Sequence, residues 1–140
     1  MTSTIPVLWP EDIKVDVQTP LSILRVQAEN LGRLTRGVLQ GEVESEEGDV
    51  YFQHRLVVVA PAYGGYRHTI LVALHKFHMP YPCEVRSESL SYEGEIGIGF
   101  PSAVSEEQLI RLVRKALTSD ETKAAMSSLI ANSISQQSKQ

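Results

Sequence analysis

Residues 50–77 read VYFQHRLVVVAPAYGGYRHTILVALHKF, and this stretch decides the fold. Two runs rich in β-branched and aromatic residues flank the sequence YGGY at residues 63–66, whose glycines can adopt a positive φ. The pattern predicts an antiparallel hairpin. Its runs LVVV and ILVAL are apolar at consecutive positions, which is typical of strands covered on both faces. We therefore expect helices on one face, and a partner or a second copy of the chain on part of the other.

Helical patterns lie on both sides of this hairpin. Thr19 and Pro20 are typical of an N-cap and a first helical residue. Ser105 with Gln108 has the spacing of a capping box, and SDET at residues 119–122 starts another helix. The first helix should end at Gly37 or Gly41, and its apolar residues recur at spacings of three, four or seven, which predicts one buried stripe: Leu21, Leu24, Ala28, Leu31 and Val38.

Shorter segments add candidate strands. Residues 41–45 (GEVES) alternate, EEGD provides a turn, and extension resumes at residues 82–89 (PCEVRSES). Residues 13–17 (IKVDV) could form a short strand or an extended lead-in. Residues 93–100 (EGEIGIGF) predict one more strand, which places three apolar side chains on one face: Ile96, Ile98 and Phe100.

Together these patterns predict the α+β class. The expected order is an N-terminal helix, an antiparallel meander sheet of about four strands, and two C-terminal helices packed on the sheet. A chain of 140 residues fits a single domain, residues 1–140. Within it we expect an extended N-terminal arm at residues 1–12 and a frayed tail at residues 135–140.

Composition narrows the class of protein. The net charge of −4 argues against nucleic-acid binding, and the single cysteine cannot form an internal disulfide. The start, MTSTIPVLWPEDIK, has no basic residue before its apolar stretch and so does not resemble a signal peptide. The longest apolar runs are far shorter than the roughly 20 residues that span a bilayer. These features predict a cytoplasmic protein with no membrane and no nucleic-acid partner.

The stretch HKFHMPYPC at residues 75–83 has the residue types most typical of a metal site or a catalytic site. His75, His78 and Cys83 are possible zinc ligands, but residues three apart in a strand point to opposite faces, and no fourth ligand is evident. Cys83 has no helix N-terminus beside it to lower its pKa. We interpret the stretch as a strand end and a corner, and we expect no catalytic residue, no metal site and no cofactor.

A charge asymmetry singles out the central hairpin. No acidic residue lies between Val50 and Cys83, whereas residues 42–49 carry five acids. One interpretation is a surface that binds an anionic partner. The other is neutralisation: if Val43 lies opposite Phe52, then Glu42 and Glu44 share a face with an arginine of the hairpin. The candidate binding residues are His54, Arg55, Tyr63, Tyr66, Arg67 and His68.

Two classes of function remain. The first is a non-enzymatic protein-interaction module (an adaptor, a chaperone or an antitoxin-like protein) that associates with itself as a homodimer or with a protein partner. The alternative is a small-molecule-binding domain or enzyme with a pocket between the sheet and a helix, in which at least two of four side chains converge: His54, Arg55, Arg67 and His68. Nucleic-acid binding through Arg25, Arg33 and Arg36 of the first helix is disfavoured by the overall charge.

Overall fold

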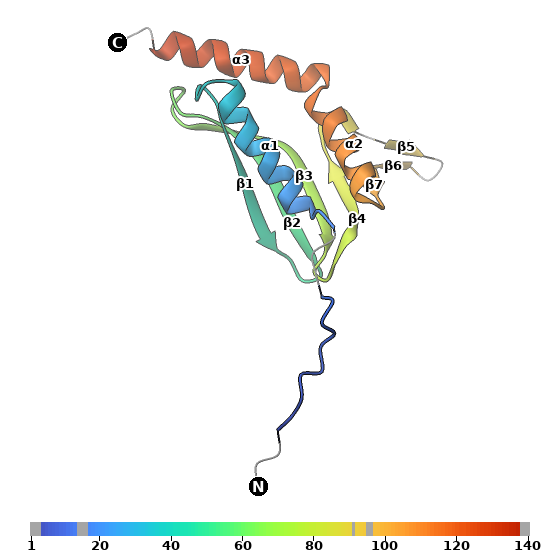
Figure 1. Ribbon diagram of the computed structural model, residues 1–140. Coiled ribbons are helices and arrows are strands. Elements are labelled where there is room, and N and C mark those ends of the chain that lie inside the picture. Colours follow the sequence, from blue (N-terminus) through green and yellow to red (C-terminus); the bar gives the residue numbers. More distant parts are fainter. Residues whose placement is uncertain (1–3, 14–16, 91, 95–96, 138–140) are drawn as a thin grey trace.

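The computed structural model describes residues 4–13, 17–90, 92–94 and 97–137, and it has the predicted α+β architecture (Figure 1). One helix precedes the sheet and two follow it, as expected. The elements in chain order are α1 (Pro20–Leu34), β1 (Gln40–Glu47), β2 (Tyr51–Ala60), β3 (Tyr66–Lys76), β4 (Met79–Arg86), the 3-10 turn η1 (Glu88–Leu90), β5 (Tyr92–Gly94), β6 (Gly97–Gly99), β7 (Ser102–Ala103), α2 (Glu106–Leu117) and α3 (Asp120–Gln137).

The main sheet is antiparallel, with the strand order β1-β2-β3-β4-β7. It has five strands rather than about four, because the two-residue strand β7 adds to β4. The prediction of a single strand at residues 93–100 is wrong. Its residues reverse direction between Gly94 and Gly97 and pair with each other as the separate ribbon β5–β6. Ile96 lies outside the described residues, as do residues 14–16 of the proposed lead-in.

The helix starts follow the capping signals in the sequence. The hydroxyl oxygen of Thr19 accepts from the Ser22 N–H at 3.1 Å, and that of Ser105 accepts from the Gln108 N–H at 3.2 Å. The end of α1 differs from the prediction. The chain leaves the helix after Leu34 and turns through two residues with positive φ, Arg36 and Gly37. Val38 therefore lies beyond the helix.

All three helices cover the same face of the sheet. Buried side chains of α1 and α2 pack with Leu56, Leu71 and Val85 in one core cluster. Leu129 of α3 packs in a second cluster with strand residues that include Val58 and Ile70. The consecutive apolar residues of β3 reflect a bulge: the β2–β3 register shifts between Leu56 and Val57 and places both Ile70 and Leu71 in the helical core.

The closest approach between a helix and the sheet lies at Gly41 of β1. A Cβ atom built there would lie 2.4 Å from the carbonyl oxygen of Ala28 and 2.5 Å from its Cα. Only glycine leaves room for the α1 backbone at this distance. Because α1 makes most of its sheet contacts with β1, Gly41 determines how closely the helix packs on the sheet.

Substitution of Gly41 by alanine should destabilise the fold by about 1–3 kcal/mol, since backbone must move to admit the methyl group. Gly32 offers a matched control in α1, because its nearest atom is 3.9 Å from an added Cβ. Gly32→Ala should leave stability unchanged or raise it by up to about 1 kcal/mol. Urea unfolding of both variants measures the difference, and equal midpoints would contradict the role of Gly41.

Candidate functional site

The face of the sheet away from the helices carries a network of ion pairs. Arg67 of β3 reaches across β2 to Glu42, at 2.8 Å, and also pairs with Glu44. Arg55 of β2 pairs with Glu44 at 3.6 Å and with Glu46 at 3.3 Å. The arginines of the central hairpin are therefore neutralised by β1.

The register that produces these pairs differs from the one considered above. Val43 lies opposite Leu56 rather than Phe52. The difference is four residues, and an even shift leaves every side chain on the same face of the sheet. Glu42 and Glu44 therefore still share a face with Arg55.

The same network explains the apolar residues on this face. Val57 and Val59 of β2 belong to neither helical core cluster, yet they are only 2% and 9% exposed. The register puts Glu42 beside Val57 and Arg67 beside Val59, so the long side chains of the ion pairs lie across these valines. Within this chain, the second face of the hairpin is covered by paired charges.

A buried chain of hydrogen bonds crosses the helical face at the other end of the hairpin. His54 and His75 are 3% and 7% exposed, and their Nε2 atoms lie 2.9 Å apart. The Ser45 hydroxyl lies 2.7 Å from Nδ1 of His54, and Nδ1 of His75 lies 2.7 Å from the carbonyl oxygen of Lys76. The ring of Phe52 packs beside both imidazoles.

These partners fix the tautomers. A carbonyl oxygen only accepts, so Nδ1–H of His75 donates to Lys76, and Nε2 of the neutral His75 ring accepts. It follows that Nε2–H of His54 donates to His75 and that the Ser45 hydroxyl donates to Nδ1 of His54. The Ser45 hydroxyl and all four ring nitrogens of His54 and His75 have a partner when both rings are neutral.

The arrangement has the order of a nucleophile, a base and an orienting group, but its electrostatics do not suit catalysis. Burial lowers the pKa of His54 to about 4, and the nearby His75 and Arg25 add to the effect. An imidazole with such a pKa is a weak general base at neutral pH. Ser45 also lies on the acidic strand β1 and lines none of the hollows described here. We interpret the hydrogen-bonded residues Ser45, His54 and His75 as a structural polar network.

The stretch at residues 75–83 is a strand end and a turn. His75 pairs with His54, whereas His78 is exposed in the β3–β4 turn. In the part of the chain that the structure describes, no three histidine, cysteine, aspartate or glutamate side chains are grouped to hold a metal ion. Cys83 is buried, and burial raises the pKa of its thiol to about 12, which makes it a poor nucleophile.

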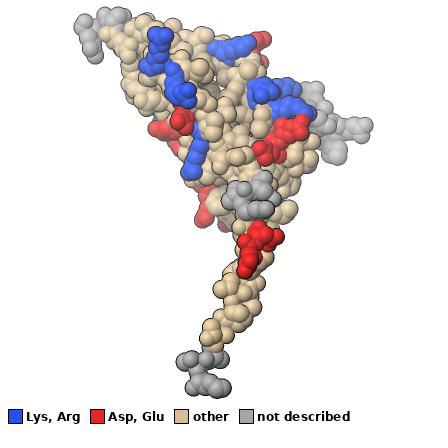
Figure 2. All heavy atoms as spheres, viewed as in Figure 1, with Lys and Arg blue, Asp and Glu red and all other residues tan. Residues whose placement is uncertain are grey.

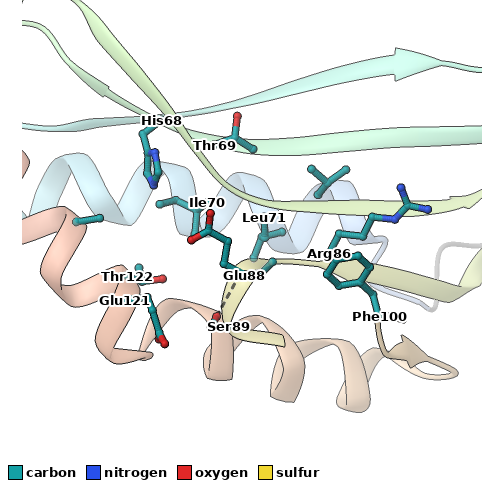
Figure 3. Close-up of a pocket in the computed structure, with 13 residues that line it drawn as sticks. His68, Thr69, Ile70, Leu71, Arg86, Glu88, Ser89, Phe100, Glu121 and Thr122 are labelled. Carbon is teal, nitrogen blue, oxygen red and sulfur yellow. Dashed lines mark hydrogen bonds between the residues drawn. The ribbon is translucent and has the colours of Figure 1, made fainter. Parts of the chain in front are cut away.

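A hollow of about 380 Å³ lies between the sheet and α3 (Figure 3). His68 and Glu88 point into it, whereas Thr69 points to the other face of the sheet. At its far end Arg86 pairs with Glu84 at 2.6 Å and lies over the Phe100 ring. At least two of His54, Arg55, Arg67 and His68 were expected to converge in a pocket, and His68 alone of the four lines this hollow.

The remaining candidate binding residues lie apart from one another. Arg55 and Arg67 meet at Glu44 on the open face, and His54 is buried under the helices at the opposite end of the hairpin from His68. Tyr63 and Tyr66 flank the hairpin turn with ring centroids 6.1 Å apart, and both are partly exposed. The six residues do not form one site.

Among the described residues, the most exposed apolar surface lies at residues 4–13, which include the described part of the expected N-terminal arm and are called the arm from here on. Every arm residue is exposed, and the segment extends away from the body of the protein (Figure 1). Ile5, Val7, Leu8 and Trp9 are between 76% and 85% exposed. Sequence reasoning missed this segment as a functional element, although the run IPVLWP, apolar and bounded by prolines, was a visible signal.

A groove of matching character runs between α1 and the other two helices. We define the helix groove as two adjoining hollows of about 210 Å³ each, which share Gln27 and Leu117. One hollow lies against α3 and reaches Leu34, and the other lies against α2 and reaches Arg114. Leu34 is 83% exposed at the mouth of its hollow.

Comparisons with known proteins add no family. No protein-family model, curated protein or solved structure matches the chain. Among the described residues, no helix has the length and apolar character needed to cross a membrane.

The histidine network makes stability depend on pH. The unfolded chain binds a proton at His54 below about pH 6.5, whereas the folded chain binds it only near pH 4. The folded protein therefore has its full free energy of unfolding above pH 6.5. As the pH falls toward 4, protonation of His54 in the unfolded chain lowers this free energy by about 3 kcal/mol in total. Urea unfolding at pH 7.5 and 4.5 should show this loss in the wild type and a smaller one in His54→Gln.

His78→Gln provides the matched control, since it removes an exposed imidazole outside the network. It should keep the wild-type dependence on pH. An unchanged dependence in His54→Gln would show that the acid sensitivity arises elsewhere in the chain.

Proposed function

We propose that this chain is a cytoplasmic protein-interaction module, of the adaptor, chaperone or antitoxin-like kind, which associates with itself. The observation that carries the proposal is the N-terminal arm, with four large apolar side chains almost fully in solvent. Burial of a leucine side chain is favourable by about 1.5–3 kcal/mol, so such an arm gains most by binding another surface. A contiguous exposed apolar segment is typical of a binding element.

The charges of the body are consistent with this proposal. Arg55 and Arg67 are held by glutamates of β1, so they are not free to hold an anionic small molecule. The histidines of the buried network are already hydrogen-bonded to each other. The large apolar side chains exposed on the arm suit a protein surface better than a small polar ligand.

Light scattering tests self-association directly. The full chain should be a dimer at micromolar concentration, and the double variant Leu8→Ser, Trp9→Ser should dissociate at protein concentrations at least about tenfold higher than the wild type. Thr4→Ser is the matched control, because it changes an exposed polar residue of the same arm. A wild-type monomer throughout the micromolar range would contradict the proposal.

A small-molecule site is the second candidate, because the hollow beside His68 has a volume within the range of roughly 300–1,000 Å³ usual for ligand pockets. It is tested by thermal unfolding with phosphate, short carboxylates and a polyamine. Binding at saturation should raise the Tm of the wild type by several degrees, and His68→Ala should lose the rise. No rise with any of these probes would count against this candidate.

A further inference from the structure

We propose that the N-terminal arm of one copy docks in the helix groove of a second copy. This inference rests on the self-association proposed above and adds the surface on which it takes place. The arm is the apolar ligand, and the groove between α1 and the α2–α3 pair is its receptor. If each of two chains places its arm in the groove of the other, both arms and both grooves are occupied, and the assembly closes as a dimer.

The size of the groove suits side chains. Each of its hollows measures about 210 Å³, below the roughly 300–1,000 Å³ usual for small-molecule sites. Leu31, Leu34 and Met126 line one hollow, and Ile23, Ile110 and Val113 line the other. Apolar walls of this kind match the leucine and tryptophan of the arm.

The charges at the two partners are complementary. In the arm, the apolar run is followed at once by Glu11 and Asp12. Figure 2 shows Lys and Arg side chains on either side of an uncharged strip between α1 and α2. Four exposed cations belong to this region, two near the end of α1 and two in the last turn of α2: Arg33, Arg36, Arg114 and Lys115.

The free edge of the sheet is a poorer receptor for the arm. An extended segment could add to β1, but that strand carries Glu42, Glu44, Glu46 and Glu47, which would repel the two acids of the arm. Pro6 and Pro10 also lack the N–H groups that a ladder requires. Charge and backbone chemistry both favour the groove over the edge.

The geometry at the root of the arm favours a second copy over the same chain. Gln18 is held by its neighbours: its carbonyl oxygen accepts from the Tyr81 hydroxyl at 2.8 Å, and its N–H donates to Glu106 at 3.4 Å. From this root α1 runs along the sheet, whereas the arm extends in the opposite direction (Figure 1). An arm that points away from its own groove is placed to reach another molecule.

Disulfide trapping tests the docking site. Leu8→Cys and Leu34→Cys are made in separate proteins, mixed and mildly oxidised. We expect a covalent heterodimer whose linked peptides join the arm to the end of α1. Val26→Cys is the matched control, since Val26 is 52% exposed on the same helix but does not line either hollow. The native Cys83 is buried and should take no part.

Trp9, the only tryptophan, gives an independent measurement. Its emission should shift to the blue as the protein concentration rises through the dimerisation range. Leu34→Glu should abolish the shift and weaken the dimer at least about tenfold, because it places a charge at the mouth of the apolar groove. Val26→Glu, the same change outside the groove, should preserve both.

The outcomes separate the two proposals. Equal trapping at Val26 and Leu34, or a blue shift that Leu34→Glu leaves intact, would overturn docking in the groove. The absence of a heterodimer between the Leu8→Cys and Leu34→Cys proteins would overturn the exchange between copies. If light scattering still shows a dimer in these cases, self-association stands without the groove, whereas a monomer overturns both.

Discussion

The packing of α1 on β1 is the constraint on which the arrangement of the other helices depends. The absence of a side chain at Gly41 lets the backbone of Ala28 approach the sheet closely, so α1 packs closely on β1 and β2. α2 then packs over β4 and β7, and α3 bridges back across the end of β2. Three helices of this size leave a seam between α1 and its neighbours, and that seam is the helix groove.

The two faces of the sheet are covered by different physical means. Helices exclude water from one face through apolar contacts. On the other face, Arg67 reaches across β2, and its aliphatic stem shields the valines beneath while its guanidinium is held by two carboxylates. Exposed ion pairs of this kind contribute little free energy each, so their main effect here is to keep an apolar strand covered without a further layer.

Local signals in the sequence predicted most of the fold. The caps at Thr19 and Ser105 and the turn at residues 63–66 depend on neighbours in the chain, and the structure has helices and a hairpin at these places. The reversal between Gly94 and Gly97 was missed because one short alternating run fits a single strand equally well. The fold class was still predicted correctly, because these errors concern the course of single strands and leave the packing of helices on one sheet unchanged.

The site residues were harder to predict because they depend on register. Ser45, His54 and His75 meet only once three strands are aligned, and no spacing within one strand reveals that. The bulge at Ile70 also changes which β3 residues face the helices. Neutralisation of the hairpin by Glu42 and Glu44 was one of two interpretations of the sequence, and it survives the wrong register because an even shift keeps both glutamates on the face of Arg55.

The acidic residues of β1 have a consequence for how copies of this protein can assemble. They line the long free edge of the sheet, and the opposite edge, β7, offers only two residues. Two such edges brought together would oppose the glutamates of one β1 strand to those of another. Edge-to-edge pairing of two sheets is therefore disfavoured, and an assembly through other surfaces would keep each sheet as a separate unit.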